Sequence, residues 1–197
     1  MPRVRIAFAK TGRAIFISHI DLPEIFGRAA RRAHLSPELT QGFSPHPRLA
    51  LGPPLPVGCA GLAEPAEFWF TSWDDGALAR WAASTPQGLD IKSAEVVPEG
   101  PSLSKLCLYA SYDIAFARAV DEVAAAALIE RYLTDAGIYA RAQASCGRVL
   151  LDASCAENLG PSRFVRALTE AGVIDGWADV LITRTAIAAA APSAAHI

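Results

Sequence analysis

The chain has 197 residues, of which 52% are hydrophobic and 19% charged, with a formal net charge of −2. This length allows one large domain or two of about 100 residues each, and the apolar content excludes a largely disordered chain. No window approaches the run of about 18 apolar residues that spans a membrane, and the N-terminus lacks the apolar core and cleavage site of a signal peptide. We therefore expect a cytoplasmic protein with no membrane contact.

Charge is distributed unevenly along the sequence. Residues 1–50 hold eight Lys or Arg and three acidic residues, a net charge of +5, and the rest of the chain carries −7. Such asymmetry favours an N-terminal part that faces something anionic. The alternative is a solvated basic face with no partner.

Apolar spacing predicts the first elements of the chain. Alternation over residues 3–9 predicts a half-buried strand, and apolar residues three and four apart predict a helix over residues 22–34. Asp21 is expected to cap this helix, with Glu24 three residues on completing a capping box. Three arginines fall on the face opposite the apolar stripe: Arg28, Arg31 and Arg32.

The remaining segments predict alternating strands and helices. The expected elements are a strand at 67–71, a helix at 74–83, strands at 90–97 and 105–116, a helix at 119–134, strands near 138–143 and 147–151, a helix at 161–171 and a strand at 178–184. Proline and glycine at residues 98–101 indicate a linker.

The order of these elements predicts the fold class. The second half reads β-α-β-β-α-β, the order of ferredoxin-like folds, and the first half fits if residues 38–51 supply its second strand. We therefore predict an α+β protein with two tandem ferredoxin-like domains built on antiparallel sheets. The N-terminal domain is expected at 1–98, the C-terminal domain at 103–185 and a flexible tail at 186–197.

Residues 41–58 form a segment too rich in proline and glycine for a helix or a central strand. Its aromatic, basic and apolar side chains predict a shaped, partly buried loop. Prolines on both sides of His46 restrict its backbone, which suits a side chain that must point one way. Phe43 and Arg48 could stack on a base and grip a phosphate. The alternative is that the loop covers a core edge, with Phe43 as a plug.

Ser18 and His19 precede the predicted helix 22–34, whose N-terminus favours anions. They could grip a phosphate, or His19 could transfer protons near neutral pH. The alternative is that Ser18 caps the helix and His19 packs. His19, His46 and a nearby arginine would also suffice for acid–base cleavage of RNA, although the sequence does not set the distance between the two histidines.

No motif indicates a cofactor or a metal. The four cysteines, at positions 59, 107, 146 and 155, lack CxxC spacing, so reduced thiols are preferred over a zinc site assembled in space. P-loop, GxGxxG and HExxH motifs are absent from the sequence. The tryptophans, Trp69 among them, are assigned to core or edge packing.

Four segments resemble a known pattern: FAKTG at 8–12, ISHIDL at 17–22, AARRA at 29–33 and GFSPHPRLALGPPLPVG at 42–58. Together they resemble the bacterial radical SAM-linked domain family of unknown function, and weaker similarity continues at 149–152 and 182–185. Ser44 departs from the family's Asn, which forms turns more strongly. The matching positions are Lys10, Ser18, His19, Asp21, Arg32, Gly42, Phe43, Pro45, His46, Pro47 and Arg48.

The resemblance implies a partner, because family members are encoded beside or fused to a radical SAM protein. Since this chain carries no radical SAM module, that partner is expected to act in trans. The leading hypothesis is a non-catalytic accessory protein of a radical SAM enzyme that binds RNA through a basic N-terminal cleft. Its expected RNA- or anion-binding residues are Lys10, Ser18, His19, Arg28, Arg31, Arg32, Phe43, His46 and Arg48.

Two alternatives stay open. One is a metal-independent endoribonuclease similar to the CRISPR repeat-processing enzymes, with His19 or His46 as the general base. The other is a protein-only adaptor that docks on the radical SAM enzyme.

Overall fold

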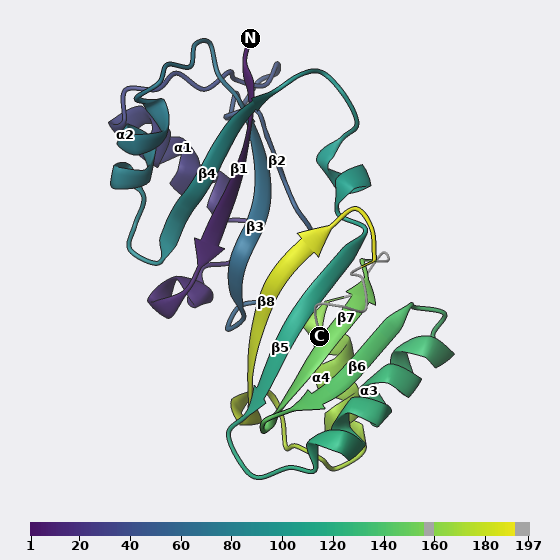
Figure 1. Cartoon of the computed structure of the whole chain (residues 1–197). Helices are drawn as coiled ribbons and strands as arrows, with labels where there is room; N and C mark the ends of the chain where they lie inside the picture. The colour runs from purple at the N-terminus through teal and green to yellow at the C-terminus, as the bar shows by residue number, and fades with distance from the viewer. Residues whose placement is uncertain (156–159, 192–197) are drawn as a thin grey trace.

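A computed structural model describes residues 1–155 and 160–191 (Figure 1). Over these residues the chain forms four α-helices and one eight-stranded open sheet. In chain order the elements are β1 (Arg3–Lys10), α1 (Leu22–Arg32), β2 (Leu49–Leu51), β3 (Ala60–Trp69), α2 (Ala77–Ser84), β4 (Leu89–Val97), β5 (Tyr109–Phe116), α3 (Glu122–Asp135), β6 (Ala140–Ser145), β7 (Arg148–Ser154), α4 (Pro161–Glu170) and β8 (Val180–Ala188). Short 3₁₀ helices lie at Gly12–Phe16, Leu103–Leu106 and Trp177–Asp179.

The sheet is mostly antiparallel and runs through both halves of the chain. Its strand order is β4-β1-β3-β8-β5-β7-β6, and β2 pairs with β3. β3 joins the halves, because its first residues, Ala60 and Gly61, pair in parallel with β8. Its last residues pair with β2 on the same edge. The fold is therefore a mixed α/β arrangement, and the division into two domains stays a prediction.

Each half has its own hydrophobic core. Val4, Ile6 and Phe8 of β1 are all buried, as their alternation predicts, and they pack with α1 and α2. Phe26 of α1 and Trp81 of α2 meet edge to face in this core, with ring centroids 6.0 Å apart. The second core lies among β5, β7, β8, α3 and α4, and it also takes in residues from the segment before β3: Leu55 and Cys59. The first half thus contributes side chains to the second core.

The predicted capping box at α1 is wrong. Asp21 is the N-cap residue, but its backbone is helical (φ −86°, ψ −20°) and its side chain accepts no hydrogen bond from the helix. Its carboxylate accepts one from the Ser18 hydroxyl at 2.6 Å. A side-chain cap is found instead at α3, where Asp121 Oδ1 accepts from the backbone N–H groups of Val123 and Ala124.

Several boundaries differ from the sequence-based expectation. β2 covers only three residues, so most of the strand expected at 38–51 has another structure. β8 continues to Ala188, and its last residues pair with β5, so the strand runs past the expected start of the tail. The rest of that predicted tail, from residue 192 on, lies outside the described residues. Among the described helices, none is both long and apolar enough to cross a membrane.

Candidate functional site

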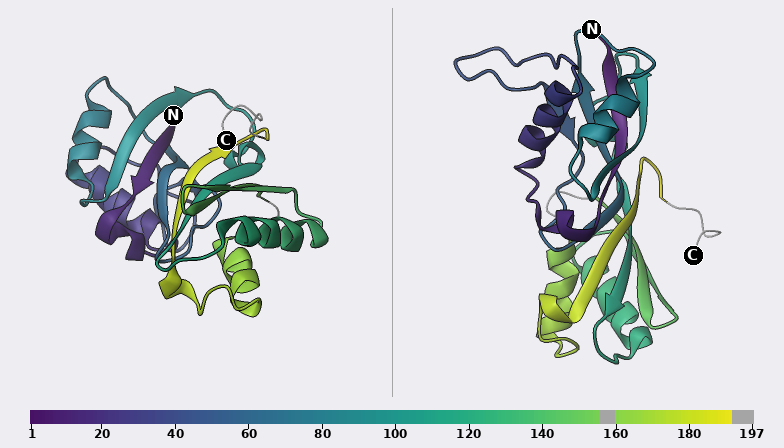
Figure 2. Two further views of the ribbon diagram at one scale, coloured as in Figure 1. Left: turned by 60° about the horizontal axis from the view of Figure 1, so that its bottom comes forward. Right: turned by 90° about the vertical axis from the view of Figure 1, so that its left-hand side faces the viewer.

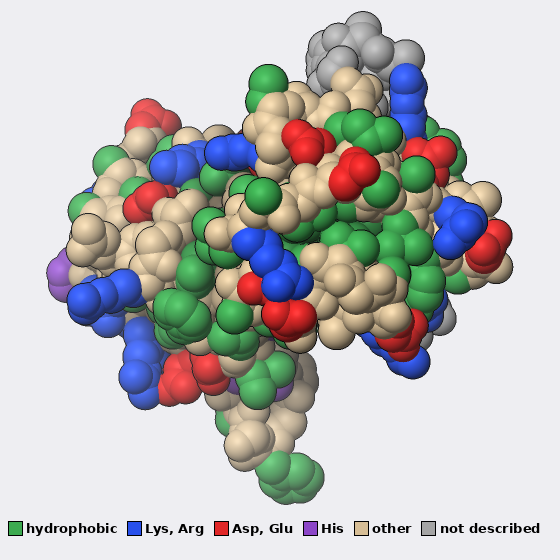
Figure 3. All heavy atoms as spheres, turned by 90° about the horizontal axis from the view of Figure 1, so that it is seen from below, with side chains coloured by type: hydrophobic (Ala, Val, Ile, Leu, Met, Phe, Trp, Pro, Cys, Tyr) green, Lys and Arg blue, Asp and Glu red, His purple; other side chains and the backbone are tan. Residues whose placement is uncertain are grey.

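Residues 37–48, here called the arm, form a narrow two-stranded projection from the end of β3. Bridges at Pro37–Phe70 and Leu39–Pro47 hold its base. Two backbone bonds continue the ladder, from Thr40 N–H to the His46 carbonyl and from Arg48 N–H to the Glu38 carbonyl. The arm extends well beyond the body of the molecule (Figure 2, right). In the space-filling view it ends in hydrophobic atoms (Figure 3).

The tip of the arm is open to solvent. Residues 41–46 are all exposed, so the prediction of a partly buried loop is wrong for this stretch. Phe43 has a relative exposure of 112%, which excludes the alternative in which it plugs a core edge. His46 is oriented by its own arm, because its Nδ1 lies 3.1 Å from both the Thr40 hydroxyl and the Ser44 carbonyl oxygen. The arm therefore presents an unburied aromatic ring beside an oriented imidazole.

The base of the arm packs on helix α1 at Gly27. A Cβ at this position would lie 2.9 Å from Pro47 Cγ and 3.9 Å from Arg31 Nη1, so glycine permits the close approach. Arg31 thus lies beside the arm. Arg28 is three residues earlier on the exposed face of α1, where it pairs with Glu24. Phe43, His46, Arg28 and Arg31 are here called the arm surface.

The remaining predicted phosphate ligands lie elsewhere or are already paired. Arg32 donates to the Ser84 carbonyl at 2.7 Å, toward α2. Arg48 pairs with Glu38 at 3.2 Å, and its guanidinium carbon lies 4.5 Å from the centre of the Trp69 ring. Basic and acidic side chains are interspersed on the face seen from below (Figure 3). The excess positive charge of residues 1–50 is therefore partly neutralised in the folded chain.

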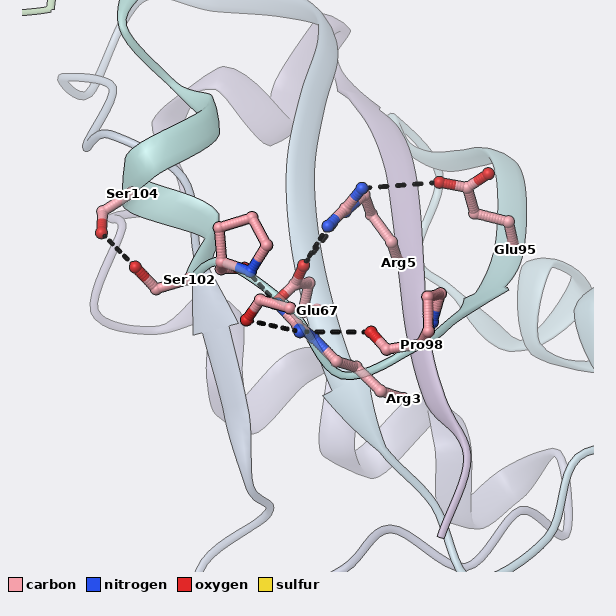
Figure 4. A network of polar contacts seen from close by, with 9 residues as sticks. Arg3, Arg5, Glu67, Glu95, Pro98, Ser102 and Ser104 are labelled. Atoms are coloured by element: carbon pink, nitrogen blue, oxygen red, sulfur yellow. Dashed lines mark hydrogen bonds and ion pairs between the residues drawn. The ribbon is translucent and has the colours of Figure 1, made fainter. Parts of the chain in front are cut away.

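Two buried arginines hold separate parts of the chain together. Arg3 donates to Glu67 and to the carbonyl oxygens of residues 98, 100 and 101, so it fixes the segment that connects the halves (Figure 4). Arg184 of β8 donates to both carboxylate oxygens of Glu64 on β3 and to the Pro53 carbonyl at 2.7 Å. The pair of Arg184 and Glu64 lies where β3 and β8 meet.

Lys10 belongs to the second of these clusters and is not at the surface. Its relative exposure is 2%, against 6% for Glu64 and 1% for Arg184. The ammonium donates to the carbonyl oxygens of Ile15 and Ile17 at 3.4 and 3.2 Å, and more weakly to that of Pro56 at 3.5 Å. Burial lowers the pKa of Lys10, and the Glu64 carboxylate opposes that shift. We call Lys10, His19, Glu64 and Arg184 the junction cluster.

His19 is half-buried in the junction cluster. With Lys10, Glu64 and Pro53 it lines a cavity of about 10 Å³, which has room for about one water molecule. Burial lowers the pKa of His19, the Arg184 and Lys10 cations lower it further, and the Glu64 carboxylate opposes them. Ser18 beside it donates to Asp21, so its hydroxyl hydrogen is committed.

The structure does not bring the two histidines into one site. His19 lies among the buried charges of the junction cluster, whereas the ring of His46 is held by Thr40 and Ser44 of the exposed arm. No described contact links their surroundings. The arrangement therefore gives no support to acid–base catalysis shared between them.

The lowered pKa of His19 predicts a pH-dependent stability. The folded protein binds the His19 proton more weakly than the unfolded chain, whose pKa is about 6.5. The free energy of unfolding should therefore fall as the pH drops from above 6.5 through the lowered pKa of the folded state. In His19→Gln this component disappears. Urea unfolding of both proteins from about pH 8 to about pH 5 measures it, and a constant difference between them would contradict the assignment.

Sequence reasoning missed Glu64, Glu67, Arg184 and the arginine-stacked Trp69. One signal was available for Arg184, since it follows Val180 and Ile182 at alternate, inward positions of β8. A charge in such a position needs a buried partner.

Two of the four cysteines, Cys59 and Cys107, are buried, and burial raises the pKa of each thiol to about 11. No group of three or more His, Cys, Asp or Glu side chains suited to a metal occurs among the described residues.

Similarity to curated proteins and to solved structures carries no argument about function. No protein of curated function matches the chain. A crystal structure of an unknown protein from Galdieria sulphuraria aligns with 94% of this chain and 99% of its own, at 11% identity and a TM-score of 0.29. A similarity this weak carries no argument about fold or function.

A protein-family model matches residues 3–154, from the first residue of β1 to the last residue of β7. The match includes the arm, α1 and three of the four residues of the junction cluster. The chain therefore belongs to the family described as an uncharacterized protein conserved in bacteria (DUF2344).

Proposed function

We propose that this chain is an accessory protein that binds single-stranded RNA on the arm surface and presents it to a radical SAM enzyme acting in trans. The observation that carries the RNA part is the fully exposed Phe43 ring at the end of an arm whose base packs on α1, the helix that carries Arg28 and Arg31. The radical SAM partner rests on the sequence resemblance alone.

The chemistry of the arm surface suits unpaired RNA. An exposed aromatic ring offers a stacking platform, and stacking contributes about 1–3 kcal/mol per base whatever the base. Arg31 and Arg28 lie one helical turn apart, where their guanidinium groups can contact successive phosphates. A base-paired helix would offer Phe43 no open base face, because its bases are already stacked.

Electrostatics should add only a modest part of the affinity. Arg28 already has a carboxylate partner, so a phosphate that binds there must compete with Glu24. With two phosphate contacts, the slope of log affinity against log salt concentration should be about −1.4. Stacking, and not bulk positive charge, would then provide most of the binding energy.

The strand order is consistent with two ferredoxin-like units. In the first half the order is β4-β1-β3-β2, and in the second it is β8-β5-β7-β6. Each half thus has its own first and third strands in the centre and its fourth and second at the edges. We interpret the chain as a tandem of such units with the boundary in residues 98–103, and the arm as an insertion before the second strand of the first unit.

Phe43→Ala should weaken RNA binding without affecting stability. Loss of the stacking platform is expected to cost about 1–3 kcal/mol, at least a roughly 5-fold rise in Kd. Arg28→Glu/Arg31→Glu should reduce affinity and also flatten the salt dependence by about 1.4 units of slope. Fluorescence anisotropy with labelled oligoribonucleotides of about 12 nucleotides and with bulk tRNA, at about 50 and about 200 mM salt, measures both effects.

The chain offers matched controls for these variants. Arg166 pairs with Glu170 four residues on along α4, as Arg28 pairs with Glu24 on α1, so Arg166→Glu repeats the charge reversal on the other half. Trp177→Ala removes another exposed aromatic ring. Both controls should bind RNA like the wild type. Absence of salt-sensitive binding by the wild type, or equal loss in the controls, would refute the proposal.

A further inference from the structure

A groove lies at the base of the arm, apart from the arm surface. It has a volume of about 370 Å³, at the lower end of the range for small-molecule sites and enough for one nucleobase. Its walls come from the N-terminus, the arm and the end of β4. The lining side chains that bear on binding are those of Glu38, Arg48, Trp69 and Glu99.

One wall of the groove is a stack of two flat groups. The guanidinium of Arg48 lies over the ring of Trp69, 4.5 Å from its centre, and two hydrogen bonds to Glu38, at 3.2 and 3.3 Å, hold its orientation. The side chain is still 49% exposed. Guanidinium planes and aromatic rings are the groups on which unstacked RNA bases lie in protein complexes. The wall is therefore oriented before any ligand arrives.

The groove is lined by two carboxylates. They belong to Glu38 and Glu99, and a carboxylate only accepts hydrogen bonds when it is ionised. Adenine, cytosine and guanine carry an exocyclic amino group that donates to such acceptors, whereas uracil has carbonyl oxygens in those positions. A carboxylate facing the edge of uracil would meet only acceptors and one ring N–H.

We propose that this groove is a nucleobase subsite that stacks a base on Arg48 and prefers bases with an exocyclic amino group through Glu38. The inference rests on the proposed RNA-binding function and adds base preference to it. Glu38 lies at the base of the arm and Phe43 five residues further on at its tip, so their Cα atoms are at most about 18 Å apart. A short stretch of one RNA strand can therefore occupy the tip and the groove together.

Binding of three homopolymers tests the subsite. The wild type should bind oligoadenylate and oligocytidylate of about 12 nucleotides about 5-fold more tightly than oligouridylate. Glu38→Gln replaces an acceptor-only group by one that also donates, so this preference should disappear or shift toward uridine. Glu95→Gln, which removes a carboxylate on β4 outside the groove lining, should keep the wild-type preference.

The outcomes separate the two proposals. Equal binding of all three homopolymers by the wild type, or an unchanged preference in Glu38→Gln, overturns the subsite and leaves RNA binding in place. Binding of no homopolymer overturns the proposed function itself. Phe43→Ala should lower the affinity for all three homopolymers by the same factor, because stacking at the tip does not distinguish bases.

Discussion

Arg184→Leu is expected to lower the free energy of unfolding by about 3–5 kcal/mol, because it leaves the buried carboxylate of Glu64 without the guanidinium that donates to it. Both side chains are almost fully removed from solvent, and Arg184 donates to both carboxylate oxygens. The loss should not be limited to this pair. The Pro53 carbonyl would also lose its donor, which loosens the segment that leads into β3.

A double-mutant cycle measures this effect by urea unfolding. Arg184→Leu/Glu64→Leu removes both charges, so it should recover a large part of the loss seen in either single variant. Arg166→Leu breaks the exposed pair with Glu170 and should cost at most about 1 kcal/mol. If Arg184→Leu costs no more than Arg166→Leu, the junction cluster does not hold β3 and β8 together.

Glu67→Leu is expected to destabilise the protein by a similar amount, about 3–5 kcal/mol, and to release the segment between the halves. Glu67 is buried and accepts from two arginines, with Arg3 Nη2 at 2.7 Å and Arg5 Nη2 at 2.8 Å (Figure 4). Without this carboxylate the buried guanidinium of Arg3 keeps its backbone carbonyl partners and the Trp69 ring, whose centre lies 5.7 Å away, but has lost its buried counter-charge. Its hold on residues 98–101 should weaken as a result.

Two measurements check the Glu67 prediction. Urea unfolding gives the loss of stability, and cleavage after Glu99 by a glutamate-specific protease reports how often residues 98–101 open. In Glu67→Leu the free energy of unfolding should fall and the rate of cleavage after Glu99 should rise. Glu95→Gln removes only the exposed partner of Arg5, at 3.7 Å, and should change neither. An unaltered cleavage rate in Glu67→Leu would show that Arg3 does not restrain the segment.

The elements that could be predicted from the sequence are those whose residue pattern lies within a single strand or helix. The alternation that buries Val4, Ile6 and Phe8 is visible within one strand. Likewise, the apolar stripe of α1 and the Pro161 start of α4 lie within one helix. The capping box failed although its residue types were right, because the side chain of Asp21 bonds to Ser18 and not to the helix.

The site depended on contacts that no local pattern contains. The sequence pattern favours Lys10 as a phosphate ligand, yet folding surrounds it with backbone carbonyls from two other segments. The pattern also allows His19 and His46 to share a site, and the fold separates them into a largely buried cluster and an exposed arm. The arm itself depends on Pro47 meeting Gly27, a contact between residues twenty positions apart.

The order of the elements, the apolar faces and the segment that forms the arm follow from the amino-acid sequence alone. Which charged residues are exposed depends on how the chain folds in three dimensions. Glu64 and Arg184 are 120 positions apart and meet only because β3 pairs with β8. Since burying a charge is costly without a partner, the sheet that brings them together also decides that they stabilise the junction. Phe43 had the opposite outcome: an apolar ring in a conspicuous loop remained in solvent, because its two-stranded arm extends away from both cores.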